Sequence, residues 1–178
     1  MADAQRVRVW DPAVRLLHWT LAALVAVDLI RDDGDEPHRL VGYAAVVVVL
    51  LRLTWGALSR SHGSLAALRP SIAGSLAYLR LLKQGRAPQP PGHNPLGAWM
   101  IWTLWLLVLL LGLTGWMSRL DAFWGDELLE GAHEILADVM LVAVGMHLAG
   151  IAAMSWLWKT NLAAAMVTGW KRIASPKV

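Results

Sequence analysis

The sequence predicts an all-α protein, a transmembrane four-helix bundle that forms a single domain over residues 1–178 with both termini in the cytoplasm. Three observations support this prediction. Hydrophobic residues make up 57% of the chain and the mean hydropathy is +0.48, which is more apolar than soluble domains are. Charged residues contribute only 16%, against about a quarter in soluble domains. The loops between the apolar segments also differ strongly in charge.

Four apolar segments are long enough to cross a hydrocarbon core of roughly 30 Å. They cover approximately residues 14–30, 38–57, 96–117 and 133–158. The first contains His18 and Asp28 and is followed by no small-residue cleavage site, so we expect a retained span rather than a cleaved signal peptide. The third contains no charged residue. The eleven tryptophans fit anchoring at the headgroup level.

Two further segments have the pattern of helices that lie on a membrane surface. Within residues 71–85, apolar side chains recur at helical spacing beside basic ones, which predicts an amphipathic helix in the loop 58–95. Residues 161–172 predict a short amphipathic tail of the same kind. The Pro/Gly-rich stretch 87–92 is the expected linker into the third span.

Basic residues predict the orientation of the bundle. Twelve of the 16 Lys and Arg residues, Lys177 among them, lie before the first span, in the loop 58–95 or after the fourth span. Because cytoplasmic segments carry the excess of Lys and Arg, these three regions are expected in the cytoplasm. The other two loops then face the periplasm of a Gram-negative host and contain Arg31, Arg39 and Arg119. Both are acidic, with Asp32, Asp33, Asp35, Glu36, Asp121, Asp126, Glu127 and Glu130.

Four histidines fall at two depths in this predicted bundle. His133 and His147 are 14 residues apart on the fourth span, so nearly four turns place both imidazoles on one face, roughly 21 Å apart along the axis. His38 and His133 are both expected near the outer face of the membrane. His18 and His147 are both expected closer to the cytoplasm. Ionisable side chains within a membrane are costly and usually face the bundle interior at functional sites. The sequence therefore predicts two depth-matched pairs.

Two imidazoles per level are the axial ligands that a six-coordinate haem iron requires, with the porphyrin supplying four equatorial nitrogens. The chain contains no cysteine, which excludes iron–sulfur clusters, thiolate ligation and covalent c-type attachment. Zinc is the weaker alternative, because two histidines fall short of four ligands; Glu134 and Asp138 in the same span keep it open. A histidine at a helix end is also commonly a plain interfacial residue. Nucleic-acid binding is not indicated, since the basic residues form no single patch.

Several other residues have both a functional and a structural interpretation. Gly42 and Gly145, close in sequence to His38 and His147, would let a porphyrin approach the backbone or simply let helices pack. Arg39 is a candidate partner for the propionates of the outer haem.

Arg52 would either pair with a haem propionate or snorkel towards the interface. Asp28 and Asp138 are embedded carboxylates that would cap a helix, pair with an arginine or relay protons. His93, at the cytoplasmic start of the third span, is a candidate quinone contact.

Six short segments resemble one family of membrane proteins. They are VWDP at 9–12, RLLHW at 15–19, HRLVGY at 38–43, LRLTWG at 51–56, GHNPLG at 92–97 and AMVTG at 165–169. Together with the His133-Glu134 pair and His147, this ordered set resembles the bacterial cytochrome b-561 / nickel–iron hydrogenase cytochrome b family. The resemblance implies a four-helix bundle in the bacterial inner membrane with two non-covalent b-type haems. It implies an inner haem between His18 and His147 and an outer haem between His38 and His133.

Members of that family pass electrons between membrane quinone and a periplasmic partner such as a cytochrome c, a hydrogenase or another dehydrogenase. We therefore expect a di-haem electron-transfer protein in the lipid bilayer, with quinone as a substrate; a homodimer is compatible with this reading. The acidic outer face favours a partner with a basic docking surface. A stand-alone superoxide:quinone oxidoreductase and a non-redox membrane anchor remain alternatives. The sequence leaves open whether the chain is an enzyme in its own right.

Overall fold

The computed structural model describes residues 4–31 and 34–174, so Asp32, Asp33 and Lys177 lie outside the described residues. Most of the described chain is helical. In chain order the elements are β1 (Ala4–Arg8), α1 (Pro12–Ile30), α2 (Glu36–Leu58), α3 (Ile72–Lys83), α4 (Pro95–Met117), a 3-10 helix η1 (Asp121–Phe123), α5 (Glu127–Leu157), α6 (Leu162–Thr168) and β2 (Trp170–Ala174).

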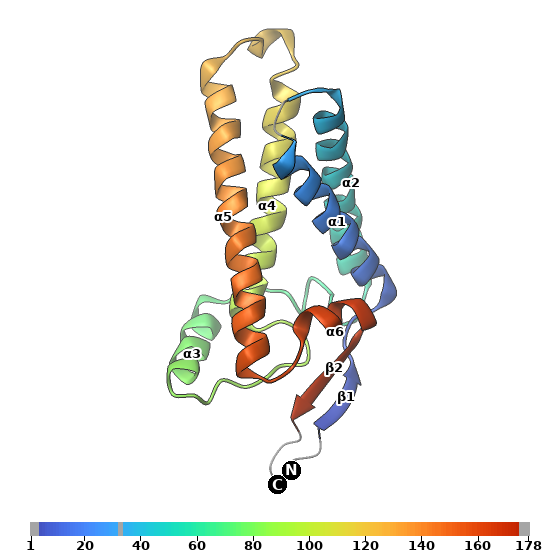
Figure 1. Cartoon of the computed structure of the whole chain (residues 1–178), viewed down its shortest axis with the longest axis vertical. Coiled ribbons are helices and arrows are strands. Elements are labelled where there is room, and N and C mark those ends of the chain that lie inside the picture. The colour runs from blue at the N-terminus through green and yellow to red at the C-terminus, as the bar shows by residue number, and fades with distance from the viewer. Residues whose placement is uncertain (1–3, 32–33, 175–178) are drawn as a thin grey trace.

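Helices α1, α2, α4 and α5 are long and apolar enough to cross a membrane. They form an elongated bundle, with α1 oblique to α2 (Figure 1). The prediction of an all-α four-helix bundle is confirmed. Outside the spans, the predicted helix within 71–85 is also confirmed, since α3 occupies most of this segment; its position on a membrane surface stays a prediction.

Each long helix begins at a side-chain cap, which a sequence can reveal. Asp11 accepts a hydrogen bond from the backbone N of Val14 at 2.9 Å, and Asn94 accepts one from Gly97 at 2.7 Å. Asp35 and Asp126 start α2 and α5 in the same way. Such caps satisfy backbone N–H groups that have no partner within the helix. The cap at Asp126 makes α5 begin at Glu127, before the apolar segment that starts at residue 133.

The hydrophobic core lies on one side of the bundle. Close packing joins α1 to α2, α2 to α4 and α4 to α5, whereas α5 does not pack closely on α1 or α2 within the described chain. The buried core residues come from α2, α4, α5 and the loop before α3. They are Ala45, Val49, Leu68, Trp105, Leu107, Val108, Met140 and Ala143.

The two ends of the described chain pair with each other. Strands β1 and β2 form an antiparallel ribbon, with Ala4 opposite Ala174 and Arg8 opposite Trp170. The interpretation of residues 161–172 as one amphipathic tail was therefore wrong in its second half. Helix α6 ends at Thr168 because Gly169 adopts a φ of +84°, which a glycine tolerates without strain. The Gly169 carbonyl oxygen then accepts hydrogen bonds from Val9 and Trp10.

The ribbon, α3 and α6 all lie at one end of the bundle, which we call the ribbon end (Figure 1). The loops that join α1 to α2 and α4 to α5 lie at the opposite end. Most basic residues thus belong to the ribbon end, and the described acidic residues of segments 34–36 and 121–130 belong to the other.

Lys171 fastens β2 to the linker that precedes α4. Its side chain is 2% exposed and its Nζ donates hydrogen bonds to the carbonyl oxygens of Pro90 at 2.6 Å and Pro91 at 3.3 Å. The ammonium also lies 5.0 Å from the ring centroid of Trp158. Burial lowers the pKa of Lys171 from 10.5 to about 8, because the charged form loses its hydration.

This shifted pKa predicts a pH-dependent stability. Between about pH 8 and 10.5, Lys171 binds a proton more readily in the unfolded chain than in the folded one. The contribution of Lys171 to the free energy of unfolding therefore rises with pH across that window. This contribution is lost as the pH falls through 8. We expect the Tm of the parent to rise relative to that of Lys171→Met as the pH goes from 8 to 10.5. Thermal unfolding of both proteins in the same detergent measures this. A constant difference in Tm would contradict it.

Candidate functional site

Two histidine pairs span the bundle interior at two levels. At the level away from the ribbon, the rings of His38 on α2 and His133 on α5 have centroids 6.3 Å apart and planes inclined by 76°. Nearer the ribbon, the rings of His18 on α1 and His147 on α5 have centroids 6.4 Å apart and planes inclined by 53°. The structure thus brings together the residues that the sequence paired by depth. Each pair crosses between helices that do not pack closely on each other.

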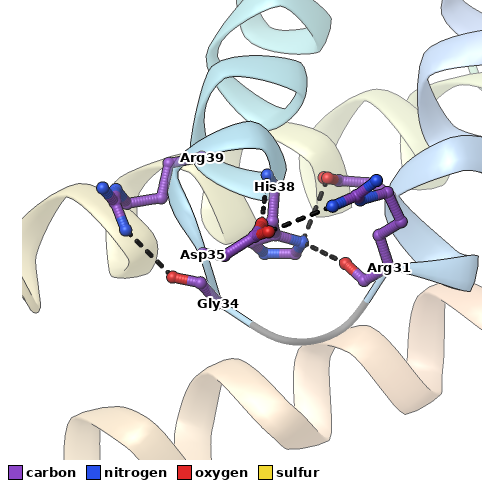
Figure 2. Close-up of polar contacts among 6 residues, drawn as sticks. Arg31, Gly34, Asp35, His38 and Arg39 are labelled. Carbon is purple, nitrogen blue, oxygen red and sulfur yellow. Dashed lines mark hydrogen bonds and ion pairs between the residues drawn. The ribbon is translucent and has the colours of Figure 1, made fainter.

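In the His38/His133 pair, a defined partner holds the Nδ1 atom of each ring. His38 Nδ1 lies 2.7 Å from the carbonyl oxygen of Arg31, as Figure 2 shows. His133 Nδ1 lies 2.7 Å from Thr114 Oγ1. That hydroxyl donates its own hydrogen to backbone carbonyls of α4, so it accepts from His133. Both rings therefore carry their proton on Nδ1 and keep the lone pair of Nε2 free for a ligand.

Glycine makes room for this arrangement on α4. A Cβ at Gly115 would lie 3.4 Å from Cε1 of His133, so a side chain there would press on the ring. Neither Thr114 nor Gly115 was predicted as a site residue, because this span was interpreted only as an apolar segment. A polar Thr and a Gly side by side in an otherwise apolar helix were the available signal.

Arg52 lies buried near the ribbon end of α2. Its side chain is 6% exposed, its Nη2 donates to the carbonyl oxygen of Gly63 at 2.6 Å, and its guanidinium lies 5.3 Å from the ring centroid of Trp105. Among the described residues, its buried Nη1 has no hydrogen-bond partner. An anionic oxygen is the natural acceptor for such a donor.

His93 lies close to the same guanidinium. Its ring centroid is 4.6 Å from that of Trp10, and its buried Nδ1 has no hydrogen-bond partner within the described part of the chain. Burial, together with the charges of Arg52 and Lys171, lowers the pKa of His93 to about 3. His93 is therefore a neutral imidazole at physiological pH.

The remaining candidates lie in different places. Arg39 donates to the carbonyl oxygen of Gly34 at 3.0 Å beside His38 (Figure 2). A Cβ at Gly42 would lie 3.3 Å from Oδ2 of Asp28. Among the described residues, no atom beyond the neighbouring stretch of α5 lies within 4 Å of the position of a Cβ at Gly145, and two residues of helix turn Gly145 to the side of α5 away from His147.

The zinc alternative gains no support from the described residues. They contain no group of three or more His, Asp or Glu side chains that could hold a metal ion. Glu134 and Asp138 are both exposed. Each histidine pair thus offers two protein ligands, and a structural zinc site needs four.

A comparison with known families gives one match. The family model described as prokaryotic cytochrome b561 covers residues 9–169, which includes both histidine pairs, Arg52 and His93. No curated protein matches the chain significantly.

The low pKa of His93 gives a prediction that NMR can check. We expect the imidazole of His93 in the 15N-histidine-labelled protein to stay neutral from pH 8 to pH 4.5, because burial disfavours its charged form. Its signal is identified by its absence from His93→Gln. Titration of that signal near pH 6.5 would show that the ring is accessible to water and would contradict the prediction.

Proposed function

Because the chain belongs to the prokaryotic cytochrome b561 family, we propose that it is a di-haem membrane cytochrome b that relays electrons between a periplasmic partner and quinone. The family carries haem b and transfers electrons in membranes. The number of haems, their ligands and the partners are our proposal. The single observation that carries it is the pair of two-histidine sites at two levels of one bundle.

The spacing of the rings fits one iron between each pair. A bond from a metal to an imidazole nitrogen is about 2 Å long, and the ring centroid lies roughly 1 Å beyond the nitrogen, so two axial rings on one ion are roughly 6 Å apart. The centroid distances of 6.3 and 6.4 Å agree with that value. Two histidines alone complete a haem iron, because the porphyrin supplies the other four nitrogens.

The surroundings of the histidines also fit a flat macrocycle. Helix α5 is not packed closely on α1 or α2, so the helices that provide the ligands do not fill the space between them by direct packing. Ligating histidines typically donate their second N–H to a carbonyl or another acceptor. His38 and His133 do so, to Arg31 and Thr114.

Arg52 and Arg39 are the proposed partners of haem carboxylates. The free Nη1 of Arg52 lies in a buried environment where a propionate would compensate the charge. Arg39, beside His38, would serve the outer haem in the same way. His93 would donate or accept a hydrogen bond with quinone through its unpaired Nδ1, and its neutral imidazole can do either.

When bound, the haems supply the one-electron couple that the chain itself lacks. The chain would hold them at two depths, because the 14 residues of α5 from His133 to His147 correspond to roughly 21 Å of helix. The basic ribbon end would face the cytoplasm and the acidic end the periplasm of a bacterial inner membrane, by the positive-inside rule.

Superoxide oxidation is the second candidate function, and the charges near His38 give it less support. Arg31 is paired with Asp35 at 3.0 Å, and Asp28 lies 3.1 Å from the His38 ring. Carboxylates beside the outer site repel an anionic substrate.

Ligand variants test the two haem sites. We expect two haems per chain in the parent protein. His18→Ala and His147→Ala should each lose the inner haem and keep the outer one, and His38→Ala and His133→Ala should do the reverse. Absorption spectra of the pyridine haemochrome measure the stoichiometry. His62→Ala, an exposed histidine outside both pairs, is the control and should keep two haems. A colourless parent, or His18→Ala with two haems, would refute the proposal.

Electron relay is tested with the parent protein in lipid vesicles. Quinol in the membrane should reduce the haems, and an external basic cytochrome c should reoxidise them at a rate that falls as salt screens the acidic face. Stopped-flow absorbance follows both steps. Haems that quinol cannot reduce would contradict the relay, and rapid reduction by superoxide would favour the second candidate.

A further inference from the structure

Asp28 on α1 reaches the ring of His38 on the neighbouring helix. Its Oδ1 lies 3.1 Å from His38 Nδ1, and both side chains are largely shielded, at 25% and 20% exposure. This oxygen is buried and makes no well-aligned hydrogen bond within the described residues. The imidazole is therefore the group that faces the carboxylate charge.

The same Nδ1 has a second acceptor. The carbonyl oxygen of Arg31 lies 2.7 Å from it (Figure 2), so the N–H of His38 points at a neutral backbone acceptor and has a carboxylate beside it. The two acceptors have separable roles. The shorter contact fixes the tautomer and orientation of the ring, and the carboxylate adds negative charge next to it.

Gly42 allows this approach. It lies one turn after His38 on α2, and a Cβ at this position would be 3.3 Å from Asp28 Oδ2. That is closer than ordinary van der Waals contact, so a side chain at Gly42 would push the carboxylate aside by a few tenths of an ångström. The absence of a side chain at Gly42 thus leaves room for Asp28.

We propose that Asp28 is a positioning residue for His38 that lowers the midpoint potential of the outer haem. This inference rests on the proposed function, because it requires His38 to be a haem ligand. A carboxylate beside Nδ1 makes the imidazole a stronger electron donor to the metal. Its negative charge also favours the more positive, oxidised form of the site in a medium of low dielectric constant. Among the described residues, the partner at His133 Nδ1 is the neutral Thr114 hydroxyl, whereas His38 Nδ1 has the Asp28 carboxylate beside it.

The test is a redox titration of Asp28→Asn and the parent. Asparagine keeps the size of the side chain and removes the charge. We expect the variant to retain two haems, because Arg31 still holds the ring, and to show one midpoint potential that is raised while the other is unchanged. A tenfold shift in the ratio of reduced to oxidised haem corresponds to about 59 mV for one electron. The EPR signal of the oxidised outer haem should move as well, since the donor strength of His38 changes.

Asp35→Asn is the matched control. Asp35 belongs to the same turn, but it accepts a hydrogen bond from the backbone N of His38 at 2.9 Å rather than from the ring, and asparagine is an equally good cap. Because Asp35 is more exposed than Asp28 and does not contact the ring, Asp35→Asn should leave the EPR signals unchanged and shift the potentials much less than Asp28→Asn does. Equal shifts in Asp28→Asn and Asp35→Asn would overturn the proposal, because they would show a general effect of surface charge. Unchanged potentials in Asp28→Asn would overturn it too.

The site of the shift is assigned in the His18→Ala background, where the outer haem is the one expected to remain. A raised potential there supports the inference, and a shift confined to the other haem overturns it. If Asp28→Asn loses the outer haem, Asp28→Glu is the deciding variant, because it restores the carboxylate. An outer haem with the parental potential in Asp28→Glu supports the role of the carboxylate. An Asp28→Glu protein that does not regain this haem and potential overturns it. A parent without haem would instead refute the proposed function itself.

Discussion

The cost of placing imidazoles inside a bilayer constrains the whole bundle. Each ring nitrogen within a hydrocarbon core needs a partner, because water is not available there. The backbone carbonyl of Arg31 and the hydroxyl of Thr114 serve the Nδ1 atoms of His38 and His133. Under the proposed function, the opposite nitrogens would bind haem iron between α5 and the first two helices. This would account for the absence of close packing of α5 on α1 and α2 among the described residues.

The chain termini complete the ribbon end of this bundle. The antiparallel ribbon joins residues more than 160 positions apart, and Lys171 ties it to the linker before α4. Trp10, the second residue after β1, packs on His93. This contact connects the ribbon to the buried imidazole. The polar groups at this end are thus fixed by segments from both extremes of the sequence.

Hydropathy was sufficient to predict the four spans, and the helical spacing of apolar residues was sufficient to predict α3. Depth along helices of known rise also predicted which histidines would face each other. The ribbon could not be predicted in this way, because strands of five residues carry too little periodicity to distinguish them from a helical tail. The roles of Thr114 and Asp28 depend on contacts between helices, and the spacing of residues along one helix gives no information about a neighbour. The role of Gly42, whose missing side chain leaves room for the Asp28 carboxylate, could not be predicted for the same reason.

The two levels of the bundle differ in the sign of the charge placed beside their histidines. Asp28 lies next to His38. Near the ribbon, the positive charge of the buried Arg52 guanidinium acts on the imidazole of His93, which is neutral. Under the proposed function, a carboxylate favours the oxidised form of the outer haem and a guanidinium favours the reduced form of the inner one. The potentials would then rise from the outer to the inner level. Such a gradient favours movement of an electron from a periplasmic donor towards the ribbon end, so fixed charges that the fold buries would set the direction of transfer.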